Sequence, residues 1–248
     1  MHRIPLPFDD AMIQRIRQER WLSTVTNGTP EELESILTDR WARISSPWVQ
    51  RFMQEVVCGQ PIGLNEYSNR FFIEVKRPKG NLTVFLAEPP DIDEVAQSSS
   101  ILRAAGKDVL ELLAQCNRMF LNSTSCSFGN FRRPKTLQAH RDAFEEPEEL
   151  QVFKASPFSL YGFQDPTSIN LSDWIVIFYD GSGYALAMNE KCEIAWYFHD
   201  VGRVVIMPLN LDGILNQIIC LSDQYPWFDF YTSMDLAKVS HAYSPGVP

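Results

Sequence analysis

The sequence lacks any long apolar run. None of its hydrophobic stretches approaches the roughly 20 residues that a membrane-spanning helix needs. The first ten residues, MHRIPLPFDD, contain no apolar segment of the kind found in a secretion signal. We therefore expect a cytoplasmic protein that has no membrane partner.

Cysteine and histidine are few and scattered. The five cysteines (Cys58, Cys116, Cys126, Cys192 and Cys220) are odd in number and form no C-x-x-C pair, which predicts reduced thiols rather than a disulfide framework. The four histidines are His2, His140, His199 and His241. Together these residues show no metal-ligand spacing, so the sequence predicts neither a metal nor a cofactor.

Clusters of basic residues are also missing. The chain has 22 Lys and Arg against 31 Asp and Glu, and its net charge is −9. Because phosphate neutralisation needs clustered cations, this balance argues against a nucleic-acid partner and is compatible with a basic protein partner. The acidic run Glu145–Glu149 is either an ordinary solvated face or a docking surface for Lys and Arg of such a partner.

What the sequence does contain is typical of a folded domain. Apolar residues make up 45% of its 248 residues and aromatic residues make up 12%. This composition indicates a globular protein, and the length suffices for one large domain or two small ones.

Residues 172–223 carry the clearest pattern. The segments Trp174–Tyr179, Tyr184–Met188, Ile194–Phe198 and Arg203–Met207 are rich in β-branched and aromatic residues, and turn-forming residues separate them. From Asn210 the apolar spacing changes to that of one helical face, which includes Leu211, Ile214, Leu215, Ile218 and Ile219. The pattern predicts an antiparallel meander closed by an amphipathic helix.

The first half predicts helices and a hairpin. Helices are expected after Asp9, from the capping box at Thr29–Glu32, and from Ser46 to Val56; a hairpin is expected at Phe71–Lys76 and Leu82–Leu86. A further helix is expected over Leu102–Cys116, and a long loop with one short helix over residues 121–150. We expect a helical and hairpin region over residues 1–95, an α+β domain over residues 100–232 and a tail over residues 233–248.

The order of residues 104–223 resembles the SMI1/KNR4 (SUKH) superfamily. The features that carry the resemblance are a helix, a polar stretch, Asp173–Ile177 followed by the glycines Gly181 and Gly183, the strand Tyr184–Leu186, Glu193–Trp196 leading to His199-Asp200, and a last helix from Leu211. Two positions depart from the family pattern. Tyr184 replaces a polar residue, and the family's NGG-like motif is reduced to Cys116-Asn117-Arg118.

The resemblance implies an α+β binding domain without a catalytic centre. Proteins of this superfamily often act as immunity proteins that block a bacterial toxin by binding to it. The resemblance covers about half of the chain, and residues 1–95 match no family pattern that we recognise.

Two groups of residues could instead carry chemistry. Cys126, His140 and Asp142 lie in a polar stretch, but no local signature marks Cys126 as a nucleophile. His199 and Asp200 are adjacent, and adjacent residues of a strand point to opposite faces, so a strand-end His and a turn Asp are favoured over a base and its orienting carboxylate.

The sequence thus predicts an α+β protein: an antiparallel meander packed against helices, with a SUKH-like C-terminal domain. Its expected function is non-enzymatic protein binding, as an immunity protein in a toxin-antitoxin pair. The residues expected to bind the partner are Glu145, Glu146, Glu148, Glu149, Trp196 and Tyr197. Two alternatives stay open: a small cytosolic hydrolase or transferase that uses Cys126 and His140, and a regulatory adaptor without a toxin.

Overall fold

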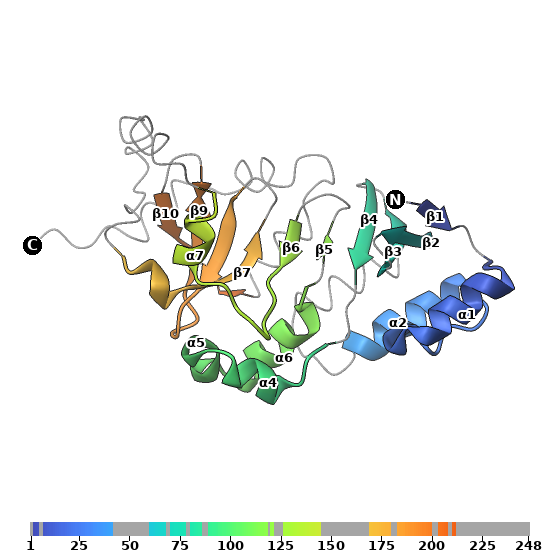
Figure 1. Cartoon of the computed structure of the whole chain (residues 1–248), viewed down its shortest axis with the longest axis horizontal. Coiled ribbons are helices and arrows are strands. Elements are labelled where there is room, and N and C mark those ends of the chain that lie inside the picture. Colours follow the sequence, from blue (N-terminus) through green and yellow to red (C-terminus); the bar gives the residue numbers. More distant parts are fainter. Residues whose placement is uncertain are drawn as a thin grey trace, which may run out of the picture.

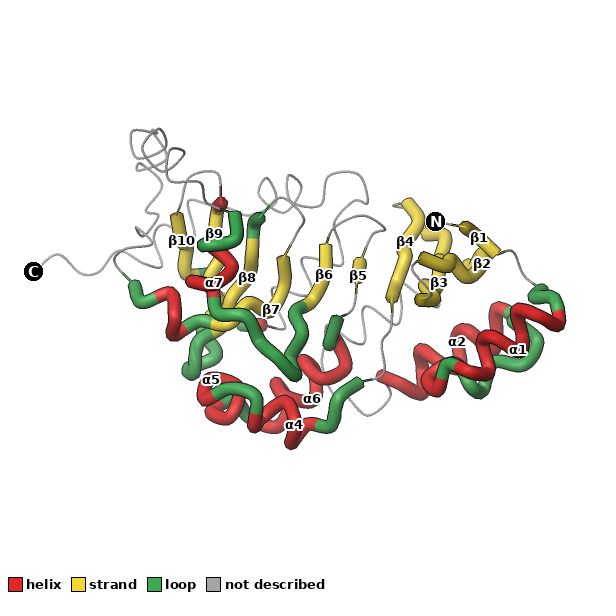
Figure 2. Tube along the Cα trace, viewed as in Figure 1, coloured by secondary structure: helices red, strands yellow, loops and turns green. Residues whose placement is uncertain are grey.

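The described strands form one antiparallel sheet in chain order (Figure 1). This computed structural model describes residues 2–4, 7–41, 60–67, 70–77, 80–85, 89–118, 120–121, 126–144, 169–179, 183–199, 203–207 and 210–211. Within them each strand from β1 to β10 pairs with the next one along the chain. Helices accompany the sheet along its length (Figure 2). The predicted α+β class with an antiparallel meander is therefore confirmed.

The elements have the following bounds. The strands are β1 (His2–Ile4), β2 (Gln60–Tyr67), β3 (Arg70–Arg77), β4 (Gly80–Phe85), β5 (Phe120–Leu121), β6 (Cys126–Phe128), β7 (Ile175–Tyr179), β8 (Ala185–Met188), β9 (Ile194–Phe198) and β10 (Arg203–Ile206). The helices are α1 (Asp10–Gln18), α2 (Pro30–Trp41), α4 (Ile92–Gln97), α5 (Ser100–Ala104), α6 (Lys107–Cys116) and α7 (Leu137–Arg141), with 3₁₀ helices at Arg20–Leu22 and Leu171–Asp173. None of these helices has the length and apolar composition needed to cross a membrane.

The predicted C-terminal meander is confirmed strand by strand. Antiparallel ladders join β7 to β8, β8 to β9 and β9 to β10. The ladder of β7 and β8 has one irregularity, between Val176 and Phe178, whereas the other two ladders keep their register throughout. The closing helix predicted from Asn210 lies outside the described residues beyond Leu211.

Asn189 organises the turn between β8 and β9. Its Oδ1 accepts hydrogen bonds from the backbone N–H groups of Lys191 and Glu193, both at 3.0 Å, and its Nδ2 donates to Glu193 Oε2 at 2.7 Å. Cys192 adopts a φ of 60° at the end of the turn. Asn suits this position because its short polar side chain satisfies nearby backbone groups.

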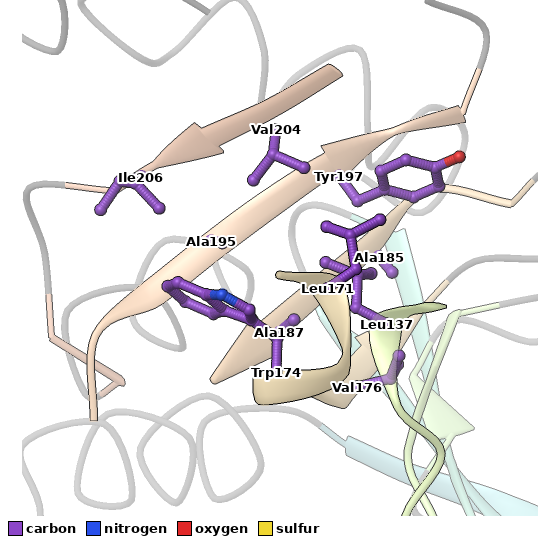
Figure 3. Packing of buried hydrophobic residues seen from close by; sticks show 10 residues of the cluster. All are labelled: Leu137, Leu171, Trp174, Val176, Ala185, Ala187, Ala195, Tyr197, Val204 and Ile206. Carbon is purple, nitrogen blue, oxygen red and sulfur yellow. The ribbon is translucent and has the colours of Figure 1, made fainter. Parts of the chain in front are cut away.

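The core beneath α7 is built on small side chains. Ala185, Ala187 and Ala195 are each 0% exposed, and they belong to β8 and β9. Because alanine adds little height to a sheet, helical segments can approach its backbone closely. The cluster that results is shown in Figure 3 and comprises Leu137, Leu171, Trp174, Val176, Ala185, Ala187, Ala195, Tyr197, Val204 and Ile206.

Two of the three predicted N-terminal helices are confirmed with their caps. Asp9 Oδ1 accepts a hydrogen bond from Met12 N at 2.8 Å and begins α1. At α2, Glu32 N donates to Thr29 Oγ1 and Thr29 N donates to Glu32 Oε2, both at 3.2 Å. These reciprocal bonds form the capping box that the sequence predicts. The helix predicted over Ser46–Val56 lies outside the described residues.

Glu32 also binds the loop that precedes α2. Its carboxylate accepts hydrogen bonds from the N–H and hydroxyl groups of Thr26 and from Asn27 N. Partial burial raises the pKa of this carboxyl, but the hydrogen bonds from Thr26, Asn27 and Thr29 outweigh it and lower the pKa from 4.5 to about 2. The folded protein therefore binds this proton less readily than the unfolded chain does.

The stabilisation from Glu32 should depend on pH. Because the folded pKa lies below the unfolded one, this contribution is fully present above about pH 4.5 and is lost as the pH falls towards 2. Glu32→Gln should lower the free energy of unfolding at pH 7 by about 1 kcal/mol, since solvent screens a half-exposed group. Urea denaturation at pH 7 and pH 3 tests this. Glu31→Gln, on the exposed side of the same helical turn, is the control, and an equal loss in both variants would contradict the role of Glu32.

The predicted hairpin is confirmed, whereas the predicted long helix is interrupted. β3 and β4 pair from Phe72↔Phe85 to Arg77↔Gly80. The helix expected over Leu102–Cys116 is divided into α5 and α6, because Ala105 is extended at ψ 144° and Gly106 occupies the N-cap of α6. Glycine is a poor residue for a helix interior and acceptable at an N-cap, which explains the break.

The sheet continues across the predicted domain boundary. Val84↔Leu121 and Phe85↔Phe120 join β4 to β5, on either side of the division expected between residues 95 and 100. At that division α4 forms instead of a linker, and Asp91 caps it by accepting a hydrogen bond from Asp93 N at 2.7 Å. Seven described elements are not predicted from the sequence: β1, β2, β5, β6, α4 and the 3₁₀ helices at Arg20–Leu22 and Leu171–Asp173.

Candidate functional site

The acidic half of the predicted partner surface is not described. Glu145, Glu146, Glu148 and Glu149 lie outside the described residues, and the described segment ends at Phe144. Their predicted role therefore stays a prediction.

The aromatic half of that surface needs correction. Trp196 is 1% exposed and Tyr197 is 0% exposed, so neither can anchor a partner on the folded surface. They are neighbours on β9 and point to opposite faces. Tyr197 belongs to the core cluster of Figure 3, and Trp196 stacks on Phe198 with ring centroids 4.3 Å apart. Both are buried because both faces of β9 are covered.

The residue set proposed for catalysis is only partly described. The backbone of Cys126 belongs to β6, and its side chain lies outside the described residues. Asp142 is exposed and accepts a hydrogen bond from Gln138 Nε2 at 2.6 Å. His140 points elsewhere, into the protein, where it is 2% exposed. Its surroundings form the candidate site.

Backbone hydrogen bonds to β7 fix α7 above the sheet. Leu137 N donates to Trp174 O and Val176 N donates to Lys135 O, both at 2.8 Å. Thr136 caps the helix, with its Oγ1 accepting from Ala139 N at 3.1 Å. His140 lies one turn into this helix, and the helix therefore places it against the sheet.

His140 closes a contact between α7 and the β7–β8 connection. Its Nε2 lies 2.9 Å from the carbonyl oxygen of Gly183. Because a carbonyl only accepts, Nε2 carries the proton and donates, which leaves Nδ1 unprotonated in the neutral ring. The imidazole is surrounded by the rings of Phe144, Tyr179 and Tyr197, with centroids at 4.8, 5.9 and 6.3 Å.

His199 approaches the same place from β9. Its ring lies 5.8 Å from that of Phe144, which thus contacts both histidines. Its Nδ1 is buried and has no hydrogen-bond partner among the described residues. We call His140, Phe144, Tyr179, Gly183, Tyr197 and His199 the histidine cluster.

The electrostatic environment of His140 disfavours its charged form. Burial lowers the pKa of the imidazole, the hydrogen bond to Gly183 raises it, and the positive charges of Lys135 and His199 lower it again; the net direction is down from 6.5. The Lys135 ammonium lies 5.9 Å from the centre of the Phe144 ring. His140 is therefore neutral at pH 7.

Gly183 is the residue that permits this packing. Its φ of 97° is a conformation that side chains rarely adopt, and a Cβ built there would lie 2.9 Å from Cγ of His199. The turn predicted at residues 180–183 thus requires glycine at its last position.

Gly183→Ala should destabilise the protein. We expect the free energy of unfolding to fall by about 1–3 kcal/mol, because the substitution adds backbone strain and displaces His199. Urea denaturation measures this. Gly106→Ala is the control, since Gly106 has φ −66° and no atom within 4 Å of the added Cβ. Equal losses in the two variants would contradict the requirement at Gly183.

The chemistry open to the histidine cluster is limited. His140 Nε2 is occupied by Gly183, and the Asp142 carboxylate is bonded to Gln138 instead of His140. Among the described residues no three His, Cys, Asp or Glu side chains come together as metal ligands. The sequence analysis missed the association of His140 with Gly183 and His199. No spacing could reveal it, because His140 and Gly183 are 43 residues apart.

Comparison with known proteins adds no relative. No family model, no curated protein and no solved structure matches the chain. The resemblance to the SMI1/KNR4 superfamily stays a prediction.

Proposed function

We propose that this chain is a non-enzymatic binding protein of the cytoplasm, an immunity protein that neutralises a cognate bacterial toxin by occupying a basic surface on it. Its net charge of −9 gives long-range attraction to a cationic partner. Nuclease toxins are partners of this kind, since they need cationic surfaces to hold nucleic acid.

The observation that carries the choice of binding over catalysis is the burial of His140. This is the base on which the alternative hydrolase or transferase depends, and only 2% of it is exposed. A general base must reach the proton that it abstracts, and Nε2 is already bonded to the Gly183 carbonyl at 2.9 Å. An enclosed imidazole of this kind fits a structural role.

Local geometry at Asn117 and Arg118 supports the SUKH resemblance. Arg118 adopts φ 56°, a left-handed conformation that glycine prefers, at the place where the family motif has glycine. Asn117 is 2% exposed, and its Oδ1 accepts a hydrogen bond from Phe131 N at 2.7 Å. The asparagine thus fixes the connection after α6, as a motif residue at a helix end would.

Co-expression with the adjacent gene product tests the proposal. Immunity proteins are usually encoded next to their toxin, so the neighbouring reading frame is the candidate partner. Expression of that protein alone should stop growth, and co-expression with this chain should restore it through a complex that co-purifies. The proposal would be contradicted if neither of the two adjacent gene products stopped growth, or if this chain restored growth without forming a complex. Either result would favour an adaptor or an enzyme.

A further inference from the structure

The histidine cluster joins three parts of the fold at one side chain. The N-terminal end of α7 is held to β7 by Leu137 N and Lys135 O. Beyond that end, the side chain of His140 reaches across to the Gly183 carbonyl and packs against Phe144, Tyr179 and Tyr197. The imidazole therefore fastens the C-terminal part of α7 and the following turn to the sheet.

This anchoring contact fits the neutral form of the imidazole. The neutral imidazole donates one hydrogen bond from Nε2 and needs no partner for a second proton. A protonated ring would carry a full charge at a residue that is 2% exposed, between aromatic rings. Burial of a charge without a compensating partner is among the costlier changes in a protein.

The groups that face His140 provide no such compensation. They are Lys135 before α7, Tyr179 on β7, the Gly183 carbonyl, Tyr197 on β9 and His199 directly after β9. Arg141 and Asp142 follow His140 in the chain, at the end of α7. Lys135 and His199 repel a second positive charge, and the exposed Asp142 is bonded to Gln138. The acidic residues Glu145, Asp180 and Asp200, next in sequence to this site, lie outside the described residues.

We propose that the neutral His140 ring anchors α7 and Phe144 to β7–β9. Protonation of the ring on acidification detaches them from these strands. Nδ1 takes one proton from solvent, and the charged ring leaves its aromatic surroundings for water. Leu137 keeps the N-terminal end of α7 in the core, so the opening is local. The acidic run Glu145–Glu149 follows Phe144 directly in the sequence.

The direction of the effect follows from proton linkage. The closed form holds the pKa of His140 below 6.5, and the open form returns it to about that value. The open form therefore binds more protons, and the closed form loses stability as the pH falls below 6.5. The opening equilibrium should rise by up to about tenfold per pH unit between 6.5 and the titration midpoint of the closed form.

Hydrogen exchange of the α7 amides tests the proposal. In the wild-type chain, protection of residues 139–144, corrected for the intrinsic pH dependence of exchange, should fall between pH 7.5 and pH 5.0, by at most about tenfold per pH unit below 6.5. Protection of β8 and β9 should stay constant. His140→Gln, whose side-chain amide can still donate to the Gly183 carbonyl but does not titrate, should abolish the pH dependence. His199→Gln is the matched control and should retain it.

Three outcomes would overturn the proposal. They are an unchanged pH dependence in His140→Gln, a loss of the dependence in His199→Gln alone, and wild-type protection that does not vary with pH. Direct titration of the wild-type histidines by NMR covers the case in which a variant does not fold. The His140 ring should titrate below 6.5 together with the α7 amides, and a midpoint at or above 6.5 would contradict the proposal.

Discussion

Trp196→Ala is expected to lower the free energy of unfolding by about 3–5 kcal/mol, the usual cost of removing a large aromatic side chain from a core. Trp196 is 1% exposed, stacks on Phe198 at 4.3 Å and lies opposite Leu186 of β8. Such a loss approaches the whole stability of a typical domain, so we also expect poor expression at 37 °C. Urea denaturation, monitored by far-UV circular dichroism because this signal reports on the backbone and does not require Trp196, measures the change.

Tyr184→Ala is the matched control for that substitution. Tyr184 is half-buried and meets the same Phe198 ring edge-on at 6.0 Å, so its truncation should cost clearly less. The comparison also separates two roles for β9. If Trp196→Ala kept wild-type stability but dissociated faster from a partner, Trp196 would be an interface residue after all.

Charge reversal in the acidic run should slow partner association. Changing Glu145, Glu146, Glu148 and Glu149 to Lys brings the net charge from −9 to −1. At low salt we expect the association rate constant to fall by at least about tenfold and to depend less on salt, because electrostatic steering accelerates encounter by 10–10³. The dissociation rate constant should change much less. Surface plasmon resonance over a salt series measures both.

The matched control reverses four other exposed acidic residues, Asp39, Asp108, Asp173 and Glu190. This variant has the same net charge of −1 but keeps the acidic run. It should associate faster than the first variant. Equal rates in the two would show that total charge, and no particular surface, directs the encounter. If the first variant kept the wild-type association rate constant, the acidic run would be only a solvated surface without a role in binding.

The sequence predicts the elements whose patterns are local. Strands β7 to β10 are separated by turn residues, and the caps at Asp9 and Thr29 lie within the turns that they begin. β5, with two residues, and β6, with three, are too short to carry a pattern of their own. They exist through their ladders to β4 and β7, which only the folded chain brings together.

The misplacement of Trp196 and Tyr197 had a visible signal. The run Ile194–Phe198 contains apolar or aromatic residues at every position, with Ala195 between Ile194 and Trp196. A strand buried on both faces reads as such a continuous run, whereas a half-exposed strand alternates with polar residues. The histidine cluster had no comparable signal, because it depends on which loops meet above the sheet.

The central claim, inhibition by direct binding without chemistry, is tested most directly by the stoichiometry of inhibition. The product of the adjacent gene is titrated with this chain, and its residual activity and mass are measured over time. We predict that inhibition grows in proportion to the amount of chain added, is complete near equal molar amounts, does not deepen with time and leaves the mass of the toxin unchanged. Complete inactivation by a small fraction of an equivalent, or a change in the mass of the toxin, would contradict this account and make the protein an enzyme.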